Sequence, residues 1–366
     1  MDTIAKLLPR AELLPLKLRE LYETYGYSKY TVSKFEPYDI YSENKSFLGN
    51  ESIITFTDPS GRLMALKPDI TLGMIKNIAP DMSSRKLYYC ENVFRTDRSS
   101  GEFAEIRQTG LEYIGGDSRY AECEVVHLAM LSLEAIGEEC VIAVSHMGYV
   151  SSLLDSYGFD DSLKRRIIEA VRHKDETDIV QAASDAGLGD GDTKKLCDAL
   201  LLYGNCRDTA QRMLAAARTE AMREAAAELE QLCDSLGGFG GKMCRLTADL
   251  SVINDFDYYN GLVMRGYIRS IPRSVLSGGR YDAMMRRLGK PQSAIGFALY
   301  LGELDRYLHD AKEYDADVLL VCGDAPARRV AEEVQRLTSE GFSVIAKQED
   351  DGGVRVKKKQ IIRGEA

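Results

Sequence analysis

One predicted β-strand carries polar residues along a single face. Residues 105–114 are predicted to form a strand, and because side chains alternate between the two faces of a strand, Gln108, Gly110 and Glu112 share one face. The missing side chain of Gly110 leaves room for a ligand between an amide and a carboxylate. An ordinary polar face exposed to solvent is the alternative. The chain is therefore expected to build a β-sheet that either borders a binding site or presents this face to water.

Length and composition indicate a folded protein with more than one domain. The chain has 366 residues, of which 45% are hydrophobic and 28% charged, and this is enough for two or three domains. The net charge of -10 argues against a general affinity for nucleic acids or anionic membranes, because Lys and Arg dominate phosphate binding. We expect neither a nucleic acid nor a membrane as a partner.

The sequence shows no targeting or membrane-spanning segment. Residues 1–9 lack the apolar core of a signal peptide, and no apolar run reaches the length needed to span a bilayer. A cytoplasmic location is the expectation that follows.

Cysteine and histidine spacing does not predict a metal site. The eight cysteines include no Cys-x-x-Cys pair, and the four histidines are not spaced as metal ligands. We expect reduced and mostly buried thiols, no metal and no cofactor.

The predicted elements divide most of the chain into a mixed part and a helical part. Residues 1–145 and 242–312 mix helices and strands, whereas residues 146–241 are mostly helical and end in a glycine-rich run. One apolar stripe in the helical part predicts core packing; its members are Met222, Ala225, Leu229, Leu232 and Leu236. Helices are predicted over 11–25, 71–78, 122–136, 281–288 and 297–310, strands over 52–57, 62–67, 86–95 and 105–114, and a hairpin turning at Asn260-Gly261 over 245–268.

The last part of the chain has a different pattern. Residues 313–366 contain a predicted strand at 317–322, a helix at 327–341 and a second strand at 342–346, followed by a charged tail from Arg355. This is an α/β fragment that is too small to be a full domain.

Three further segments place polar or aromatic groups beside glycine or proline. In Leu66-Lys-Pro-Asp-Ile-Thr-Leu72, Asp69 and Thr71 stand at a predicted helix start, where either side chain could be an N-cap. Asp257-Tyr-Tyr-Asn-Gly261 contains Tyr258 and Tyr259 and is also compatible with an ordinary hairpin. Ser277-Gly-Gly-Arg-Tyr-Asp282 is equally compatible with a Gly-Gly turn before a helix.

In their order and separation these segments resemble the motifs of the histidyl-tRNA synthetase family over residues 1–310. Residues 91–112 are similar to motif two of class II aminoacyl-tRNA synthetases, and 249–261 and 277–282 to the two histidyl signatures. The resemblance implies an α+β fold with a class II aminoacyl-tRNA synthetase-like antiparallel sheet and flanking helices, built from residues 1–145 and 242–312. It also implies a mostly helical insertion at 146–241 and a partial anticodon-binding-like α/β fragment at 313–366.

The same resemblance implies a histidine pocket. Gln108 and Glu112 match residues that hold the ammonium of the ligand, which needs several acceptors when it leaves water and bonds most strongly to carboxylates. The histidine-binding residues implied are Asp69, Thr71, Gln108, Glu112, Tyr258, Tyr259, Gly279 and Arg280. Arg95 matches the arginine on the nucleotide α-phosphate, and we interpret it as the remnant of a nucleotide site.

Departures from the family pattern predict that aminoacylation is lost. Asn254 takes the place of the catalytic arginine, Glu102 and Ala104 stand where the motif-two loop is expected to carry arginines, and Glu303 stands at the motif-three arginine. Losing one preorganised donor at a transition state commonly costs about 10²–10³ in rate. Residues 316–366 can supply at best half of the anticodon-binding domain. We therefore assign no catalytic residue.

The combined pattern is similar to the family of ATP phosphoribosyltransferase regulatory subunits, which are histidyl-tRNA synthetase paralogues without aminoacylation activity. The resemblance implies a non-catalytic subunit that binds L-histidine and forms a homodimer within a hetero-oligomer with the short-form ATP phosphoribosyltransferase catalytic subunit. Such a subunit is required for activity and feedback control of the first step of histidine biosynthesis. A divergent or truncated histidyl-tRNA synthetase, and a synthetase-like ligase for another substrate, stay open as alternatives.

Overall fold

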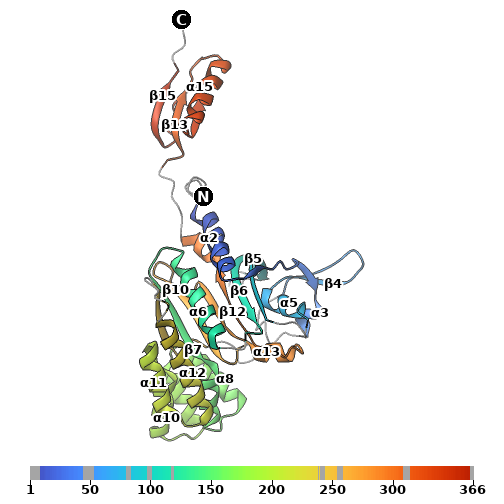
Figure 1. Ribbon diagram of the computed structural model, residues 1–366, viewed down its shortest axis with the longest axis vertical. Coiled ribbons are helices and arrows are strands. Elements are labelled where there is room, and N and C mark those ends of the chain that lie inside the picture. The colour runs from blue at the N-terminus through green and yellow to red at the C-terminus, as the bar shows by residue number, and fades with distance from the viewer. Residues whose placement is uncertain are drawn as a thin grey trace. The chain divides into compact units, whose positions relative to one another are not determined.

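A nine-stranded sheet is the centre of the larger part of the molecule (Figure 1). The computed structural model describes residues 9–43, 53–79, 84–96, 101–116, 119–237, 239, 244–253, 259–307 and 314–362. The chain divides into two compact units, Met1–Leu308 and His309–Ala366, and the sheet belongs to the first. None of the described helices is long and apolar enough to cross a membrane.

The large sheet is mostly antiparallel, with strand order β1-β5-β6-β12-β11-β10-β7-β9-β8. The β1–β5 and β7–β9 ladders are parallel. The strands are β1 (Ser28–Lys29), β5 (Arg85–Thr96), β6 (Phe103–Ile114), β7 (Cys140–His146), β8 (Tyr203–Asn205), β9 (Cys244–Asp249), β10 (Leu262–Ile268), β11 (Leu276–Arg280) and β12 (Ala294–Tyr300). The strands predicted over 86–95 and 105–114 are confirmed, and they pair with each other along their whole length.

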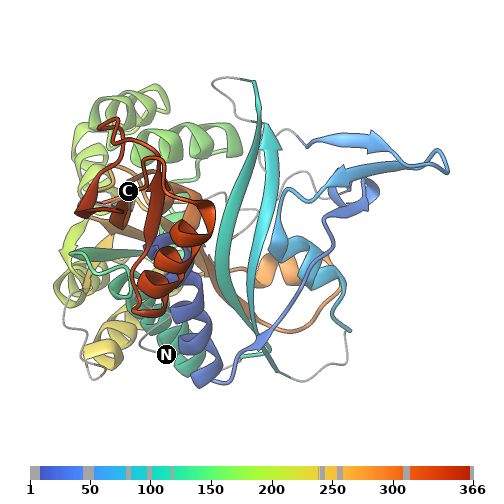
Figure 2. The same cartoon turned by 90° about the horizontal axis from the view of Figure 1, so that it is seen from above.

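Helices cover both faces of this sheet. Neighbouring residues of a strand point to opposite faces, so Tyr88 of β5 packs with α2 (Arg10–Thr24) and α6 (Arg119–Glu134). Tyr89 instead packs with α5 (Ile70–Lys76) and α13 (Asp282–Arg287). Figure 2 shows α2 and α5 on opposite sides of the β5–β6 hairpin. The sheet therefore separates two apolar cores, and any site on it belongs to one face or the other.

A second, three-stranded sheet leads the chain into α5. Its order is β2 (Phe35–Pro37), β4 (Leu63–Leu66), β3 (Thr55–Thr57), and α3 (Asp39–Ser42) follows β2. Directly after β4, the fully buried ammonium of Lys67 lies 3.1 Å from Glu91 Oε2 of β5. This ion pair ties the small sheet to the large one just before Asp69, where α5 begins.

The predicted helical part is helical in the structure. Its described helices are α7 (Met147–Asp155), α8 (Asp161–Arg172), α9 (Glu176–Asp185), α10 (Asp190–Leu200), α11 (Cys206–Ala216) and α12 (Glu220–Gly237). All five members of the predicted apolar stripe on α12 are buried, which confirms core packing. The expectation that all thiols are reduced is wrong for one pair. Because α11 packs against α12, Cys206 and Cys233 form a disulfide with their Cα atoms 6.0 Å apart.

Two predictions about secondary structure, one of a hairpin and one of a helix, are wrong. The segments at 245–268 do not form a hairpin, because β7 lies between β9 and β10 and pairs with both. An alternating pattern shows that a segment is a strand, but it does not identify the neighbouring strand.

The helix predicted over 297–310 begins too early. Residues up to Tyr300 belong to β12, where Phe297 and Leu299 are buried, and α14 spans Leu301–Tyr307.

The second unit is a three-stranded parallel sheet with one helix. The strand order is β14 (Val344–Lys347), β13 (Ala316–Val321), β15 (Val356–Ile361), and α15 (Ala327–Ser339) connects β13 to β14. The charged tail predicted from Arg355 is wrong, because most of it forms β15. The ammonium of Lys357 lies 2.8 Å from Asp317 Oδ1 of the neighbouring strand β13.

Candidate functional site

A pocket lies on the face of the sheet that α5 and α13 cover. The β6–β12 register places Gln108 opposite Tyr300, Gly110 opposite Ala298, and Glu112 opposite Gly296. The pocket measures about 180 Å³, below the roughly 300–1,000 Å³ of sites for drug-sized ligands. It is lined by Asp69, Ile70, Thr71, Tyr89, Arg95, Gln108, Glu112, Tyr259, Ser277, Tyr281, Gly296, Phe297, Ala298 and Tyr300. Its size suits a ligand as small as an amino acid.

The structure brings most of the predicted site residues together. Asp69, Thr71, Gln108, Glu112 and Tyr259 all line the pocket. The alternation predicted for the Gln108–Glu112 face therefore holds, and this face borders a cavity rather than open solvent. Tyr258 lies outside the described residues, so its place in the site stays a prediction.

Two predicted residues do not line this cavity. Gly279 pairs with Gly296 and lies behind Tyr259. The guanidinium of Arg280 points elsewhere, since Nε donates to Asp282 Oδ2 at 2.7 Å and Nη1 donates to Glu122 Oε1 at 2.8 Å. Gly279 thus lies against a pocket tyrosine, and Arg280 is held by two carboxylates. A direct contact of either with histidine stays a prediction.

Three glycines on the pocket face let side chains lie against the sheet. A Cβ atom at position 296 would stand 1.8 Å from Glu112 Oε2, one at position 110 would stand 2.6 Å from Tyr89 Oη, and one at position 279 would stand 2.7 Å from Tyr259 Cδ1. Such distances are far inside van der Waals contact, so a larger residue at any of the three positions would displace a pocket side chain; at positions 110 and 279 it would also meet the backbone oxygens of Phe297 and Leu262.

Glu112 is a buried carboxyl group of the pocket. Its side chain is only 2% exposed. Thr71 Oγ1 donates to Oε1 at 2.7 Å and Tyr281 Oη donates to Oε2 at 2.6 Å. Burial raises the pKa of Glu112 to about 8, although the two hydroxyl donors act in the opposite direction. A cationic ligand in this pocket would stabilise the ionised form of Glu112.

Asp69 places a second carboxyl group beside the first. It is the N-cap of α5, where Oδ1 accepts from the backbone N–H of Leu72 at 2.7 Å. Burial raises the pKa of Asp69, while this bond and the charge of Arg95 lower it. The sequence allows Asp69 to be both a cap and a ligand contact, and in the structure one oxygen caps the helix while the residue lines the pocket.

Tyrosines complete the walls, and most were not predicted. Burial, together with the charge of Glu112, raises the pKa of Tyr89 and of Tyr259, so both remain neutral hydroxyls. Tyr89 is opposite Gly110 in the β5–β6 ladder, and Tyr281 directly follows Arg280. Strand periodicity could have predicted Tyr89, because it is on β5 opposite Gly110. Tyr281 could have been predicted as well, because it belongs to the Gly-Gly-Arg-Tyr segment.

Two positions that are expected to carry catalytic arginines, 104 and 303, lie in the part of the chain that the structure describes, and neither has a cationic side chain. Ala104 is directly opposite Arg95 in the β5–β6 ladder. Glu303, on α14, lies 3.4 Å from Arg273 Nε and does not line the pocket. Asn254 lies outside the described residues. Arg95 is thus the one cationic side chain among the described residues that line the pocket, and its Nε donates to Pro68 O at 2.9 Å.

Comparison with known families matches most of the chain. A family model described as histidyl-tRNA synthetase matches residues 5–304. The chain is 25% identical to an ATP phosphoribosyltransferase regulatory subunit from Alkaliphilus metalliredigens over 354 residues, which are 94% of this chain and 89% of that relative. It is 29% identical to the protein of the same name from Geobacter metallireducens, over 89% of this chain and 77% of the relative.

Solved structures share the fold. A Bacillus halodurans structure described as an ATP phosphoribosyltransferase regulatory subunit/histidyl-tRNA synthetase has a TM-score of 0.80 at 23% identity, covering 97% of this chain and 94% of its own. A histidyl-tRNA synthetase from Nostoc has a TM-score of 0.72 at 20% identity, covering 93% and 82%. At these identities the likeness shows the fold alone, and it confirms the predicted α+β fold of class II synthetase type.

The raised pKa of Glu112 predicts a pH-dependent stability of the ligand-free protein. The folded-state pKa of about 8 lies above the ordinary value of 4.5, so the contribution of Glu112 to stability is present at low pH and is lost as pH rises toward 8. Each unit of pKa corresponds to about 1.4 kcal/mol. Thermal unfolding of the wild type and of Glu112→Gln at about pH 5 and about pH 8.5 tests this linkage.

We expect the variant to gain stability relative to the wild type at the higher pH. Part of this gain reflects the removal of repulsion between Glu112 and Asp69, whose charge contributes to the raised pKa of Glu112. A difference in melting temperature that is the same at both pH values would show that Glu112 is not desolvated in the empty pocket.

Proposed function

The chain belongs to the histidyl-tRNA synthetase family, and we propose that within it the chain is a non-catalytic regulatory subunit of ATP phosphoribosyltransferase. One observation carries the proposal. The pocket retains the acceptors that an amino acid's ammonium needs, whereas Ala104 and Glu303 stand at positions where adenylate chemistry needs cations. Relatives with that name match this chain over most of its length, which supports the same conclusion.

The ligand that we propose for the pocket is L-histidine. Asp69 at the start of α5, together with Gln108 and Glu112 on β6, offers oxygen acceptors to its ammonium, and a hydrogen bond from Thr71 holds Glu112 in place. Tyr258, Tyr259, Gly279 and Arg280 complete the proposed histidine site, as the family resemblance implies. A desolvated ammonium is stabilised best by carboxylates, because charge-assisted hydrogen bonds are the stronger ones. Binding would therefore draw Glu112 into its ionised form.

Regulation requires a partner in which the ligand changes an equilibrium. A ligand controls an activity only through different affinities for two states of an assembly. We infer that the partner is the short-form ATP phosphoribosyltransferase catalytic subunit, and that histidine bound to this chain lowers its activity. The synthetase-like core at 1–145 and 242–312 forms a homodimer, which offers two equivalent pockets to a closed mixed oligomer in the cytoplasm. The insertion at 146–241 and the fragment at 313–366 are accessory to this core.

One observation favours a second candidate, a divergent histidyl-tRNA synthetase. Arg95 remains in the pocket, where a synthetase would use such an arginine on the nucleotide α-phosphate. Arg95 alone is a weak substitute for the several arginines that a synthetase uses, since removing one preorganised donor already costs about 10²–10³ in rate. We therefore rank the regulatory function first.

The proposal predicts that Glu112→Gln weakens histidine binding about tenfold or more. The substitution exchanges a charge-assisted bond of about 1.5–3 kcal/mol for a neutral one of about 0.5–1.5 kcal/mol, and about 1.4 kcal/mol is a factor of ten in affinity. Isothermal titration calorimetry above pH 8 measures the change. Glu105→Gln is the matched control, because it removes an exposed carboxylate from the same strand. Equal affinities for wild type and Glu112→Gln would show that Glu112 is not part of the histidine site.

A second prediction concerns the partner. Mixed with a short-form catalytic subunit, this chain should form a particle heavier than either protein alone, measured by light scattering. Its phosphoribosyltransferase activity should fall when histidine is added. The Glu112→Gln chain should still assemble but should need more histidine for the same inhibition, because Glu112 is buried and its substitution changes almost no exposed surface. A catalytic subunit that stays apart, with an activity indifferent to this chain and to histidine, would contradict the proposal.

A further inference from the structure

A disulfide joins the last two helices of the helical part. Cys206 is the first residue of α11, Cys233 lies on α12, and their Cα atoms are 6.0 Å apart. Figure 1 shows these two helices near β7, and α12 packs against that strand. Arg207 Nε also lies 3.4 Å from Asp234 Oδ1, so an ion pair joins the same two helices beside the disulfide. The helices can therefore stay paired when the disulfide is reduced.

The two cysteines are suited to exchange with thiols. Cys206 is only 4% exposed, whereas Cys233 is half-buried, so a thiolate from solution reaches Cys233 and Cys206 is the leaving group. Asn205 caps α11, where its Oδ1 accepts from the backbone N–H of Arg207 at 3.0 Å. The positive end of this helix dipole stabilises the departing Cys206 thiolate.

On its other side, α12 makes a hydrogen bond to the end of β7. Glu228 Oε2 lies 3.1 Å from Nε2 of His146, a residue that is only 6% exposed. The other ring nitrogen, Nδ1, has no hydrogen-bond partner among the described residues. Within that part of the chain, Glu228 alone fixes the imidazole by hydrogen bonding, so a displacement of α12 acts first on His146.

His146 is connected to a wall of the proposed histidine pocket. The next residue, Met147, donates its backbone N–H to the oxygen of Gly261 at 2.9 Å. A Cβ atom at position 261 would stand only 3.1 Å from Arg280 Cδ, so this backbone is held closely. Tyr259, which lines the pocket, is two positions before Gly261. One short backbone segment therefore links His146 to the pocket.

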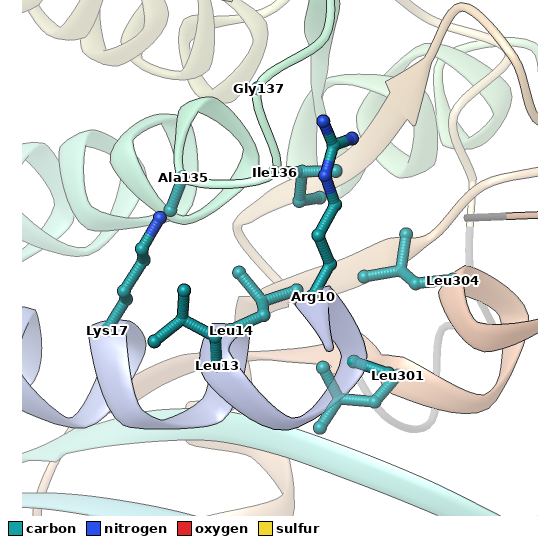
Figure 3. A pocket seen from close by; sticks show the side chains of 10 residues that line it. Arg10, Leu13, Leu14, Lys17, Ala135, Ile136, Gly137, Leu301 and Leu304 are labelled. Atoms are coloured by element: carbon teal, nitrogen blue, oxygen red, sulfur yellow. The ribbon is translucent and has the colours of Figure 1, made fainter. Parts of the chain in front are cut away.

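A cavity leaves α12 room to move. It measures about 230 Å³ and separates part of α12 from the start of α6. By contrast, the lining of the cavity of about 200 Å³ at the start of α2, which Figure 3 shows, includes no residue of α12. Glu122 and Glu228 border the cavity beside α12, where Glu122 accepts from Arg280 and Glu228 holds His146. Packed side chains resist displacement and a cavity does not, so α12 can shift at this place.

We propose that the Cys206–Cys233 bond is a redox switch that sets how firmly α12 holds His146 and, through it, the affinity of the pocket for histidine. The second half of this proposal rests on the proposed histidine binding. In the oxidised chain the disulfide restrains α12 so that Glu228 fixes His146. In the reduced chain α12 can move toward the cavity, and the segment that leads to Tyr259 is held less firmly.

A dithiol is the reductant that the exchange requires. One of its thiolates attacks Sγ of Cys233, the disulfide breaks, and Cys206 leaves as a thiolate. The second sulfur of the dithiol then attacks the mixed disulfide and releases Cys233. The protein gains two thiols, whose protons come from the dithiol, and the dithiol becomes a disulfide. A small disulfide oxidises the protein by the reverse steps.

Histidine titration of the oxidised and the reduced full chain tests the switch. The chain is treated with oxidised glutathione or with dithiothreitol and desalted, and mass spectrometry after alkylation shows whether Cys206 and Cys233 are linked. The reduced wild type should bind histidine about two- to thirtyfold more weakly, the range of measured couplings between separate sites. Cys206→Ser should bind like the reduced wild type after either treatment. Cys90→Ser is the matched control, because it removes an exposed free thiol and should leave the redox response unchanged.

Glu228→Ala tests the route from α12 to the pocket. The variant loses the hydrogen bond to His146, so it should bind histidine more weakly when oxidised and should no longer respond to reduction. Glu224→Ala is its matched control, because Glu224 is exposed one turn earlier on the same helix. A response of Glu228→Ala as large as that of the wild type would contradict this route.

Two results would overturn the switch: equal histidine affinities of the linked and the reduced wild type, or a redox response that persists in Cys206→Ser. If neither form binds histidine, the proposed function fails. Hydrogen–deuterium exchange over residues 146–149 then decides whether the disulfide controls His146. Faster exchange in the reduced chain supports that control, and equal exchange in both forms contradicts it.

Discussion

The buried carboxyl group of Glu112 connects the elements that form the proposed histidine pocket. It accepts hydrogen bonds from Thr71 on α5 and from Tyr281, which directly precedes α13. One side chain on β6 therefore holds two helices against the same face of the sheet. Both donors are neutral, and burial raises the pKa of Glu112 to about 8. A site arranged in this way is less stable when it is empty and ionised, and a bound cation offsets that loss.

Ligand binding and adenylate chemistry depend on different groups in this fold. Binding an ammonium uses the acceptors on β6 and at the start of α5, and the structure places them around one cavity. Activation of an amino acid needs cations that stabilise negative charge as it develops. Among the positions expected to carry these cations, Arg95 still has an arginine. Ala104, which is opposite Arg95 in the β5–β6 hairpin, and Glu303, which pairs with Arg273, do not. Loss of the cations leaves the acceptors intact, so a synthetase-like fold can keep a binding site after losing its reaction.

The sequence predicts local features of this protein better than its long-range pairings. The face shared by Gln108, Gly110 and Glu112 follows from strand geometry alone, and the buried stripe on α12 follows from helical periodicity. The position of β7 between β9 and β10 does not, because it depends on packing across more than one hundred positions of sequence. The Cys206–Cys233 bond depends in the same way on how α11 meets α12. Tyr281 belongs to the Gly-Gly-Arg-Tyr segment, but its role depends on reaching Glu112 of β6 from the start of α13.

The central claim is that the chain binds histidine without activating it. Histidine-dependent exchange of pyrophosphate into ATP tests this most directly, in a preparation whose histidine binding has been established by calorimetry. The account predicts saturable histidine binding with no exchange above the background without enzyme, because the described positions of the missing cations carry Ala104 and Glu303. Exchange at a rate typical of an aminoacyl-tRNA synthetase would contradict it.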